Sequence, residues 1–377
     1  MKICHITFDH FWNDARVYKK EILSQKEKGY EVIFYGWDRP EEKIDNGVQF
    51  ISHFNYQPTK KERMKLMFSN KNIVNDLIKL NADIYQFHDF TLLEVGRKLK
   101  KAGRHVIFDC HENYLGTVPL KLGRNKLGTF IFAKLLDEYY KRAVSLFDAV
   151  FTVSPNMVEA IKKYNPKTYM VSNYPSINKY AEPAKCDKED FFVFQGTVYG
   201  FSNQKYIVEA INKVKSNARY KIIGNVFDNE KKIIEDNDTQ KRVDIVEWME
   251  KEDLDRNMQQ SIGGIVVLDY TAECCFKEGQ LGSNKIFEYM LCGLPVICTD
   301  FKLWKDLIID KYKCGICVEP KNSEQLKAAM EWIISHPEEA KAMGQRGRDA
   351  ILNEFNWEKG LRQYFDYYSQ IVENTLK

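Results

Sequence analysis

The stretch LGSNKIFEYMLCGLPVICTD, residues 281–300, places a short loop, a helix, a Gly-Leu-Pro stop and an apolar strand directly one after another. Glycine and proline end the helix, because glycine adopts the left-handed conformation that follows a helix and proline cannot continue one. The apolar run after them is typical of a buried strand. A helix that leads at once into a buried strand predicts an α/β fold with a parallel sheet.

The same alternation of apolar runs and amphipathic helical stretches extends through the rest of the chain. In the second half the strand-like runs are FFVFQG (191–196), YKIIGN (220–225), VDIVEW (243–248), GGIVVLD (263–269) and CGICVEP (314–320). In the first half they are KICHITF (2–8), YEVIFYG (30–36), ADIYQF (82–87), RHVIFD (104–109), DAVFTVS (148–154) and TYMVSNYP (168–175). We therefore predict two successive Rossmann-like domains, each with a doubly wound parallel sheet.

The domain linker is predicted in SINKYAEPAKCDKED (176–190), which is polar, contains Pro183 and has no apolar period. This gives an N-terminal domain over residues 1–175, a C-terminal domain over 190–355, and a helix over 356–377 that packs back on the N-terminal domain. In such folds the ligand lies in the cleft at the carboxyl ends of the strands.

Composition indicates a globular protein of the cytoplasm. With 44% hydrophobic and 13% aromatic residues the chain has the apolar material for two cores. No apolar stretch approaches the roughly 18 to 20 residues that span a bilayer, and the first residues lack a signal-peptide pattern. The nine cysteines follow no disulfide spacing, and Cys314 and Cys317 fall in a strand-like run, which favours a structural role over a redox or zinc site.

The two halves of the chain differ in charge. Residues 1–175 hold 28 Lys and Arg against 20 Asp and Glu, whereas the remainder holds 28 against 33. A basic N-terminal half suits an anionic partner, such as a phosphate-bearing lipid or an anionic membrane face. No nucleic-acid-binding motif accompanies this charge, so nucleic acid is not an expected partner.

The opening of the helix in residues 281–300 has the features of a phosphate site. Unpaired backbone N–H groups and the positive end of the helix dipole attract phosphate oxygens there, and a lysine adds a full charge. Glu288 lies one turn further along, where a carboxylate can accept hydrogen bonds from ribose hydroxyls. The phosphate-binding candidates are Gly282, Ser283, Asn284 and Lys285.

This segment resembles the donor-binding signature of glycosyltransferase family 4, whose members are retaining enzymes of the two-domain GT-B architecture. The resemblance covers nearly the whole chain and includes HDF (88–90), FDCHENY (108–114), DAVFTVSPNMVEAI (148–161) and VSNYPS (171–176). It implies two Rossmann-like domains facing a central cleft, with the acceptor on the first domain and the nucleotide-sugar on the second. It also implies that Glu288 binds the donor ribose.

Two departures from the family pattern concern the donor. Gln280 stands where the family has a glutamate near the sugar hydroxyls, and Glu278 is a nearby substitute. Thr197 and Ser202, in the loop that Gly196 opens, stand where the family usually has an arginine or a lysine for the diphosphate. The positive charge that a departing diphosphate requires must then come from Lys285, Lys205 or another basic residue.

On the acceptor side, WNDARVYKKE (12–21) resembles the first loop and helix of the family. Asp14 is a candidate N-cap. Arg16 either binds an anionic group of the acceptor or pairs with Asp14. We therefore expect this helix to lie on the acceptor side, with Asp14 and Arg16 as the candidate residues.

The catalytic candidates are His111 and Glu112, which follow a predicted strand at the place where open α/β sheets expose catalytic groups. The resemblance implies that His111 lies near the reacting sugar. It would donate a hydrogen bond to a sugar hydroxyl, while Glu112 orients it or binds acceptor. The alternative is a surface turn. His88 and Asp89 have the same placement after another strand and are further acceptor-side candidates.

The resemblance implies a front-face mechanism in which the departing diphosphate takes the acceptor proton, so no side-chain nucleophile is assigned. The sequence has no Asp-x-Asp at a strand end and no histidine-rich spacing, so neither a metal nor another cofactor is expected.

Two basic stretches, TKKERMKLMFSNKN (59–72) and LGRNKLGTFIFAKLL (122–136), either rest on an anionic membrane or pack their apolar face in the core.

The sequence thus predicts a transferase that moves a sugar from a nucleotide-sugar to a glycan or lipid-linked acceptor in surface polysaccharide or glycoconjugate biosynthesis. It would act in the cytoplasm, at the inner face of the cell membrane if the acceptor is lipid-linked. A non-catalytic nucleotide-sugar binder, motivated by Thr197, Ser202 and Gln280, and an epimerase or hydrolase on the same scaffold are the alternatives. An NAD-dependent oxidoreductase is disfavoured because no G-x-G-x-x-G follows the first strand.

Overall fold

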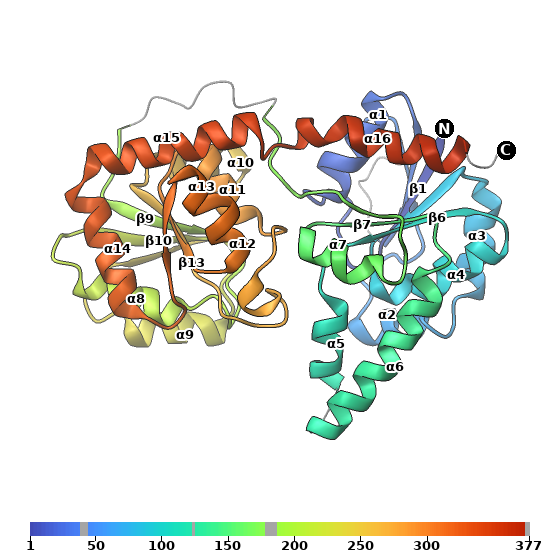
Figure 1. Cartoon of the computed structure of the whole chain (residues 1–377), viewed down its shortest axis with the longest axis horizontal. Coiled ribbons are helices and arrows are strands. Elements are labelled where there is room, and N and C mark those ends of the chain that lie inside the picture. The colour runs from blue at the N-terminus through green and yellow to red at the C-terminus, as the bar shows by residue number, and fades with distance from the viewer. Residues whose placement is uncertain (38–43, 123–124, 178–186, 374–377) are drawn as a thin grey trace. The chain divides into compact units, whose positions relative to one another are not determined.

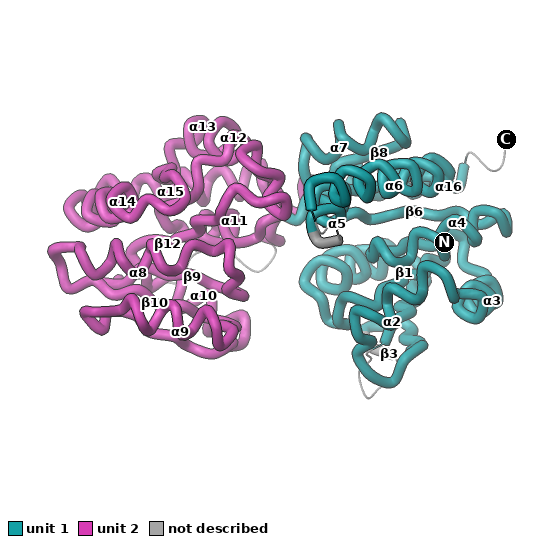
Figure 2. The backbone as a smooth tube through the Cα atoms, turned by 90° about the horizontal axis from the view of Figure 1, so that it is seen from below, with its two compact units in different colours: residues 1–173, 360–377 teal, residues 174–359 magenta. Residues whose placement is uncertain are grey.

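The computed structural model describes residues 1–37, 44–122, 125–177 and 187–373. They form two compact units, which Figure 2 shows in different colours: unit 1 comprises residues 1–173 and 360–377, and unit 2 comprises residues 174–359. Most of the predicted linker, including Pro183 and Cys186, lies outside the described residues.

Unit 1 is built on a sheet with the strand order β3-β4-β2-β1-β5-β6-β7-β8 over the described residues. All neighbouring strands are parallel except β3 and β4. The strands are β1 (Lys2–Ile6), β2 (Glu31–Gly36), β3 (Ile44–Asp45), β4 (Val48–Ser52), β5 (Ile84–Phe87), β6 (His105–Cys110), β7 (Ala149–Thr152) and β8 (Thr168–Met170). The predicted parallel α/β sheet is therefore confirmed.

The hairpin of β3 and β4 was not among the predicted strands. Its turn holds Asn46 and Gly47, both with positive φ, at 49° and 74°. An Asn-Gly pair is the usual signal for a two-residue hairpin turn, because both central residues must adopt left-handed conformations. The signal was present, but β3 is only two residues long and carries no apolar period.

Helices connect the parallel strands of unit 1 (Figure 1), except β2 and β4, between which only β3 is described. A π-helical segment (Val17–Ile22) continues into α1 (Leu23–Glu27). The others are α2 (Lys60–Leu66), α3 (Lys71–Leu80), α4 (Leu93–Lys101), α5 (Tyr114–Leu122), α6 (Lys126–Val144) and α7 (Pro155–Lys162). They carry the chain from the end of one strand to the start of the next, as a doubly wound sheet requires.

Unit 2 has a parallel sheet with the strand order β11-β10-β9-β12-β13-β14. The strands are β9 (Phe191–Gln195), β10 (Arg219–Ile223), β11 (Val243–Val246), β12 (Gly263–Val266), β13 (Val296–Thr299) and β14 (Gly315–Val318). The helices are α8 (Gln204–Lys213), α9 (Asp228–Asn237), α10 (Lys251–Gln260), α11 (Asn284–Leu291), α12 (Lys302–Trp304), α13 (Asp310–Tyr312), α14 (Ser323–Ser335) and α15 (Pro337–Asn353). Apolar residues of α8, α9 and α14 pack on one face of the sheet in a single buried cluster.

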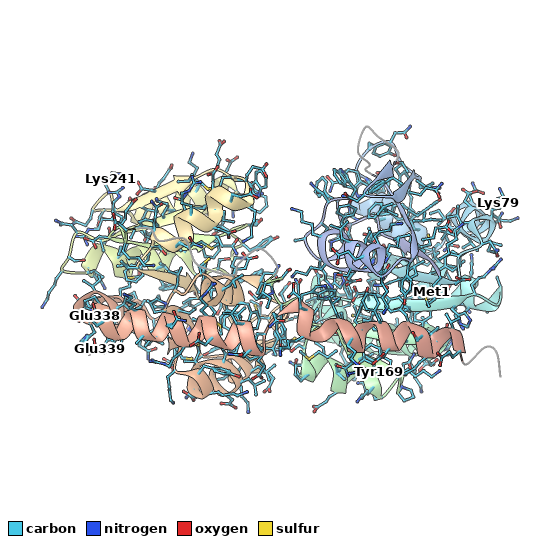
Figure 3. All side chains as sticks on the ribbon, turned by 90° about the horizontal axis from the view of Figure 1, so that it is seen from above. Met1, Lys79, Tyr169, Lys241, Glu338 and Glu339 are labelled. Carbon is cyan, nitrogen blue, oxygen red and sulfur yellow. The ribbon has the colours of Figure 1, made fainter. Side chains whose placement is uncertain are left out.

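The last helix, α16 (Trp357–Glu373), packs its aromatic residues on unit 1. The ring of Tyr367 stacks on that of Tyr169 with 4.0 Å between centroids, and Figure 3 shows Tyr169 beside this helix. Tyr364 and Tyr368 contact the ring of Phe151 on β7. Helix α16 therefore contributes to the core of unit 1, although almost 200 residues separate it from the rest of that unit.

Two further sequence expectations concern membrane spans and cysteines. Over the described residues, no helix is both long and apolar enough to traverse a bilayer. The eight described cysteines are all free. Cys314 is buried directly before β14 and Cys317 lies within that strand, so the C-x-x-C belongs to a strand and its approach, as predicted.

Candidate functional site

In unit 1, the carboxyl ends of β1, β5 and β6 bring the predicted acceptor-side residues together. Phe87 pairs with both Ile6 and Phe108, so His88, the next residue after β5, lies between the ends of β1 and β6. Asp109 is within β6, and His111 follows the strand directly. Neighbouring parallel strands end at one edge of a sheet, which explains why residues distant in sequence meet here.

Asp109 is the centre of this group, and the sequence analysis did not identify it. Its side chain is fully buried. Its Oδ2 atom lies 2.6 Å from His111 Nε2 and 3.2 Å from His88 Nδ1. His88 Nε2 in turn lies 3.0 Å from His5 Nδ1, and His5 Nε2 lies 2.9 Å from Gln25 Oε1. A chain of hydrogen bonds thus runs from His111 into the core of unit 1.

Arg16 belongs to this buried group as well. Its NH2 donates to Asp109 Oδ1 at 2.9 Å, and its Nε lies 3.1 Å from both His111 Nε2 and Glu21 Oε1. Its NH1 donates to the carbonyl of Val171 at 3.0 Å. Arg16 is only 4% exposed. Instead of either expected partner, Asp14 or the acceptor, the Arg16 side chain pairs internally with the buried carboxylate of Asp109 and the buried carboxyl of Glu21.

Asp14 caps the helix that follows it, as predicted. Its Oδ1 accepts hydrogen bonds from the backbone N–H groups of Arg16 and Val17, each at 2.8 Å. Its Oδ2 lies 3.3 Å from His10 Nδ1. Burial opposes charge on this pair, but the hydrogen bond to Asp14 and that carboxylate's charge prevail and raise the pKa of His10 to about 9.

The protonation states follow from burial and charge. Burial would raise the pKa of Asp109, but the Arg16 guanidinium beside it holds that pKa well below its usual range. Burial and the nearby Asp109 raise the pKa of Glu21 well above its usual range. One cation therefore faces one ionised carboxylate and one neutral carboxyl, so the group is close to electrically balanced.

The histidines of the group are neutral near pH 7. Burial lowers the pKa of His5 to about 3 and that of His88 to about 4. Burial also lowers the pKa of His111, more than Asp109 raises it. Two groups approach His111 Nε2: Asp109 Oδ2, which can only accept, at 2.6 Å, and the Arg16 Nε–H at 3.1 Å. The shorter contact favours a proton on Nε2, which leaves Nδ1 of the neutral ring as an acceptor for a sugar hydroxyl. The contact with the sugar that the sequence analysis expects stays a prediction.

The side chain of His111 is 13% exposed, so it is not the surface-turn histidine of the alternative interpretation. Glu112 is exposed, and its predicted role stays a prediction. Asp89 is fully buried and holds the loop after β1: its Oδ1 accepts from Thr7 Oγ1 at 2.8 Å, and its Oδ2 accepts from the N–H of Phe8 at 2.5 Å. Asp89 and His88 are both fully buried in unit 1, so they support the residues around them and are not exposed to an acceptor.

Two groups of described residues have the ligand atoms for a metal ion: His5 with Glu21 and His88, and His88 with Asp109 and His111. The sequence analysis found no such group, because each combines residues that are far apart in sequence and come from different elements. Arg16 already pairs with Glu21 and Asp109 in both groups. Its permanent charge would repel a dication at either place.

In unit 2, the loop after β9 meets α11. Gly196 has a φ of 99°, which favours glycine, and a Cβ built there would lie 3.3 Å from Cε and Nζ of Lys285. Gln195 Nε2 donates to Glu288 Oε2 at 2.9 Å, and the Gln195 N–H donates to the Tyr289 hydroxyl at 3.0 Å. The predicted donor residues Gly196, Lys285 and Glu288 are thus brought together. Gln195 and Tyr289, which fix this contact, were not identified from the sequence.

The start of α11 has polar atoms without protein partners. No hydrogen bond or ion pair joins Lys285 Nζ to another described residue, and burial lowers the pKa of this ammonium. Its Nζ lies 5.3 Å from the centroid of the Phe194 ring. Asn284 Oδ1 is buried and lacks a hydrogen-bond partner among the described residues. Ser283 precedes the helix and makes no side-chain capping bond. The Lys285 ammonium and the unpaired N–H groups of the first helical turn are donors that an anionic ligand satisfies, whereas Asn284 Oδ1 accepts and requires a donor such as a hydroxyl.

Other predicted donor residues have structural partners. Gln280 Oε1 accepts from the N–H of Gly282 at 2.5 Å, so this side chain shapes the loop before α11. Ser202 is buried, and its Oγ accepts from the N–H of Tyr199 at 3.1 Å. Thr197 is half-buried, in the loop directly after Gly196.

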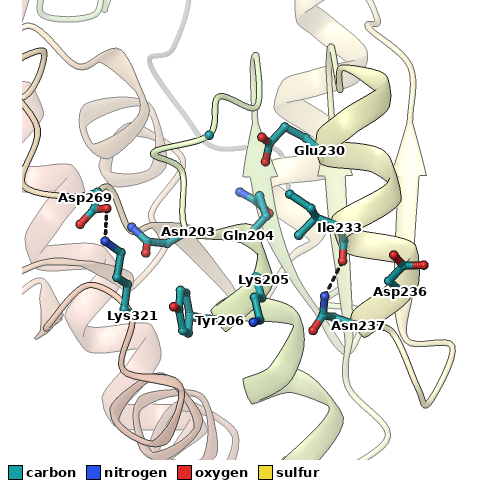
Figure 4. A pocket seen from close by; sticks show the side chains of 11 residues that line it. Asn203, Gln204, Lys205, Tyr206, Glu230, Ile233, Asp236, Asn237, Asp269 and Lys321 are labelled. Atoms are coloured by element: carbon teal, nitrogen blue, oxygen red, sulfur yellow. Dashed lines mark hydrogen bonds and ion pairs between the residues drawn. The ribbon is translucent and has the colours of Figure 1, made fainter. Parts of the chain in front are cut away.

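Lys205 lies elsewhere, beside a hollow of about 350 Å³ that Figure 4 shows. It faces Glu209 at 3.8 Å. Figure 4 also shows the pair of Lys321 and Asp269 at 2.5 Å across the same hollow. Neither Gly196 nor Lys285 lines it, so the structure does not bring Lys205 to the group on α11.

Two family models match the chain. The model described as Glycosyltransferase Family 4 matches residues 22–173, and the model described as Glycosyl transferases group 1 matches residues 177–350. Two uncharacterized glycosyltransferases of Methanocaldococcus jannaschii match over shorter stretches: one is 22% identical over 116 residues, and the other 32% over 85 residues. These stretches cover 31% and 22% of this chain, but only 29% and 24% of the two relatives.

Solved structures share the fold over nearly the whole chain. A sucrose-phosphate synthase from Thermosynechococcus elongatus has a TM-score of 0.76 at 15% identity, with 99% of this chain and 100% of that chain covered. An Anabaena protein solved with UDP and glucose has a TM-score of 0.70 at 14% identity, with 98% and 100% covered. With one family model on each half and two Rossmann-like parallel sheets, the chain belongs to the GT-B glycosyltransferases of group 1.

Proposed function

We propose that this protein is a retaining, hexosyltransferase-type enzyme that moves a sugar from a nucleotide-sugar to a glycan or lipid-linked acceptor. We place it in surface polysaccharide or glycoconjugate biosynthesis, in the cytoplasm and in peripheral contact with the inner face of the cell membrane. The observation that carries the proposal is the position of Lys285: it lies at the start of α11, against Gly196, and no hydrogen bond or ion pair joins its ammonium to another described residue.

Lys285 supplies the charge that Thr197 and Ser202 do not. A diphosphate at the start of α11 would receive the ammonium and the unpaired N–H groups of the first turn together. Burial of this lysine strengthens its attraction to phosphate, because the surrounding dielectric is low. The missing arginine and lysine of the family are thus compensated from the helix instead of from the loop after β9.

Glu288 follows Lys285 by three residues and therefore lies on a similar side of α11. Its hydrogen bond with Gln195 fixes the carboxylate at the carboxyl end of β9. From there its second oxygen can accept from ribose hydroxyls. The Anabaena structure with UDP and glucose supports a uridine nucleotide as the first donor to test.

In unit 1 we propose that His111 accepts a hydrogen bond from a sugar hydroxyl through Nδ1, in an orientation that Asp109 and Arg16 hold. The departing diphosphate takes the acceptor proton, so no side chain needs to act as a nucleophile. We also propose that transfer requires no metal ion. Lys285 and the helix dipole would neutralise the diphosphate, and Arg16 already pairs with Asp109, the carboxylate beside His88 and His111.

A second candidate is a non-catalytic nucleotide-sugar binder. It is favoured by Gln280, whose side-chain oxygen bonds to the loop at Gly282 instead of presenting a carboxylate to the sugar. Such a protein would bind the donor through Lys285 and Glu288 but would not transfer or hydrolyse it.

The test is a thermal-shift and product-release screen of the purified chain with UDP-, GDP- and ADP-sugars, with and without EDTA. We expect one donor to raise the melting temperature and to be hydrolysed slowly, with no effect of EDTA. Glu288→Ala should lose most of the shift, because the ribose contact is gone. Stabilisation without any release, even with a panel of acceptors, would support the binder instead. No stabilisation by any donor would contradict both.

A further inference from the structure

An uncovered apolar stripe runs along the first half of α6. Leu127, Phe130, Ile131 and Leu135 are 68%, 57%, 48% and 62% exposed. Their spacing of three, four and eight residues from Leu127 places them on one side of the helix. Leu120 on the neighbouring α5 is 56% exposed. We name Leu120, Leu127, Phe130, Ile131 and Leu135 the α5–α6 surface.

The second half of α6 behaves differently. Tyr140, Ala143 and Val144 are buried, which anchors this half to the rest of unit 1. Figure 1 shows α5 and the first half of α6 extending beyond the sheet of their unit. The buried second half of α6 therefore anchors the helix, and the first half exposes its apolar residues. Soluble proteins rarely leave a continuous apolar patch of this kind uncovered unless it binds something.

Charge identifies what the patch would bind. Between Asn113 and Leu136 the sequence has no acidic residue, but it has four basic ones, Lys121, Arg124, Lys126 and Lys134. Lys126 and Lys134 are exposed, and Lys134 Nζ lies 4.7 Å from the Phe130 ring centroid. Asp137 and Glu138, both exposed, end this basic zone, and Glu138 pairs with Arg142 at 2.7 Å in the anchored half. Apolar side chains flanked by Lys126 and Lys134 suit an anionic lipid surface.

The other basic stretch, residues 59–72, lacks this arrangement. It folds into α2, which begins with a capping box between Thr59 and Glu62 and buries Leu66. Phe68 alone among its apolar residues is highly exposed, at 84%. Of the two alternatives from the sequence analysis, core packing is correct for Leu66 on α2, but it is wrong for the exposed apolar residues on α6.

We propose that the α5–α6 surface docks this protein on an anionic lipid bilayer. The apolar side chains enter the interface, while Lys126 and Lys134 pair with lipid phosphates. Helix α5 begins at Tyr114, three residues after His111, so docking brings the membrane close to the acceptor side of unit 1. The proposal concerns the surface alone and stands whether or not the proposed transfer occurs.

The test is co-sedimentation of the full chain with phosphatidylcholine vesicles, with and without phosphatidylglycerol. We expect binding to the anionic vesicles that salt weakens. The affinity of the triple variant Leu127→Ser, Phe130→Ser, Leu135→Ser for anionic vesicles should fall at least about tenfold, because three apolar side chains no longer enter the interface. Lys126→Gln with Lys134→Gln should reduce binding to anionic vesicles only. Phe68→Ser, an exposed phenylalanine outside the surface, is the matched control and should bind like the wild type.

A second measurement uses a variant that keeps the surface apolar. Phe130→Trp should gain fluorescence that brominated anionic lipids quench, because residue 130 enters the bilayer. Wild-type binding by the triple variant, absence of vesicle binding by the wild type, or no quenching at residue 130 would each overturn the proposal. A wild-type dimer that the triple variant converts to a monomer, without vesicle binding, would instead make the surface a contact between two copies. Donor-induced thermal shifts of all variants report separately on the proposed transferase site.

Discussion

Arg16 and Asp109 form a buried ion pair, with the guanidinium NH2 donating to Oδ1 at 2.9 Å across a separation of 93 residues in sequence. The pair lies beneath His111, which contacts both partners. Asp109 fixes the tautomer of His111, and Arg16 keeps Asp109 ionised. The predicted sugar-facing histidine thus depends on two residues that do not face the sugar.

Asp109→Asn should weaken both the fold and the proposed reaction. It leaves Arg16 without its ionised partner in a buried place, which typically costs about 3–5 kcal/mol of unfolding free energy. It also removes the acceptor that orients His111, so kcat should fall on the order of 100-fold while KM for the donor, which binds unit 2, stays nearly constant. Urea unfolding and steady-state kinetics measure the two effects. The exposed Asp137→Asn is the control, and an unchanged kcat in Asp109→Asn would contradict the positioning role.

The His10–Asp14 pair predicts a pH dependence. Because the folded pKa of His10 is raised to about 9, above the ordinary value of 6.5, the pair stabilises the fold below pH 6.5. That contribution is lost as the pH rises through about 9. The side chains are 28% and 27% exposed, so solvent screening limits it to about 1 kcal/mol. The unfolding free energies of the wild type and His10→Gln should therefore differ at pH 6 and converge by pH 10. A constant difference over this range would contradict the ion pair.

Most strands were predictable because each is a short, nearly continuous apolar run, as in Phe191–Gln195, where every residue is buried, whereas β3 and β4 were missed. The grouping of Lys285 with Glu288 on α11 was predictable because the two residues are close in sequence as well as in space. Asp109 was not, since its partners Arg16 and His88 come from other elements and are joined only by the strand order. The same limit hid the uncovered stripe on α6: amphipathic spacing indicates which residues share a side, but not whether anything packs on it.

Tyr368 gives α16 a polar link to the core of unit 1. Its hydroxyl donates to Gln86 Oε1 and accepts from Gln25 Nε2 at 3.1 Å, and Gln25 contacts His5. Tyr368→Phe keeps the ring but removes the donor to Gln86 Oε1, while Gln25 Nε2 keeps its hydrogen bond to the Tyr364 hydroxyl at 2.9 Å. Leaving this buried oxygen without its donor costs about 1–3 kcal/mol of unfolding free energy. Thermal and urea unfolding check this loss. Tyr367→Phe, whose ring stacks on Tyr169, is the control and should be close to the wild type.

Lys285→Met should have opposite effects on stability and on donor binding. Without ligand, the Lys285 ammonium has no hydrogen-bond or ion-pair partner among the described residues, and burial lowers its pKa. Replacing it with an apolar side chain of similar length therefore removes a desolvation cost. We expect the free protein to gain about 1 kcal/mol of unfolding free energy. Donor affinity should nevertheless fall about 10- to 100-fold, because the diphosphate loses its charged partner.

Lys205→Met distinguishes this site from the hollow of Figure 4, since Lys205 lines that hollow and Lys285 does not. It should leave donor affinity unchanged, because its ammonium is exposed and faces Glu209. Calorimetric titration with the nucleotide-sugar measures both variants, and urea unfolding measures the change in stability. A loss of donor affinity in Lys205→Met but not in Lys285→Met would assign the diphosphate to the hollow of Figure 4 instead of the start of α11. A loss of stability in ligand-free Lys285→Met would mean that this ammonium is held by the protein itself, which removes the reason for assigning it to the donor.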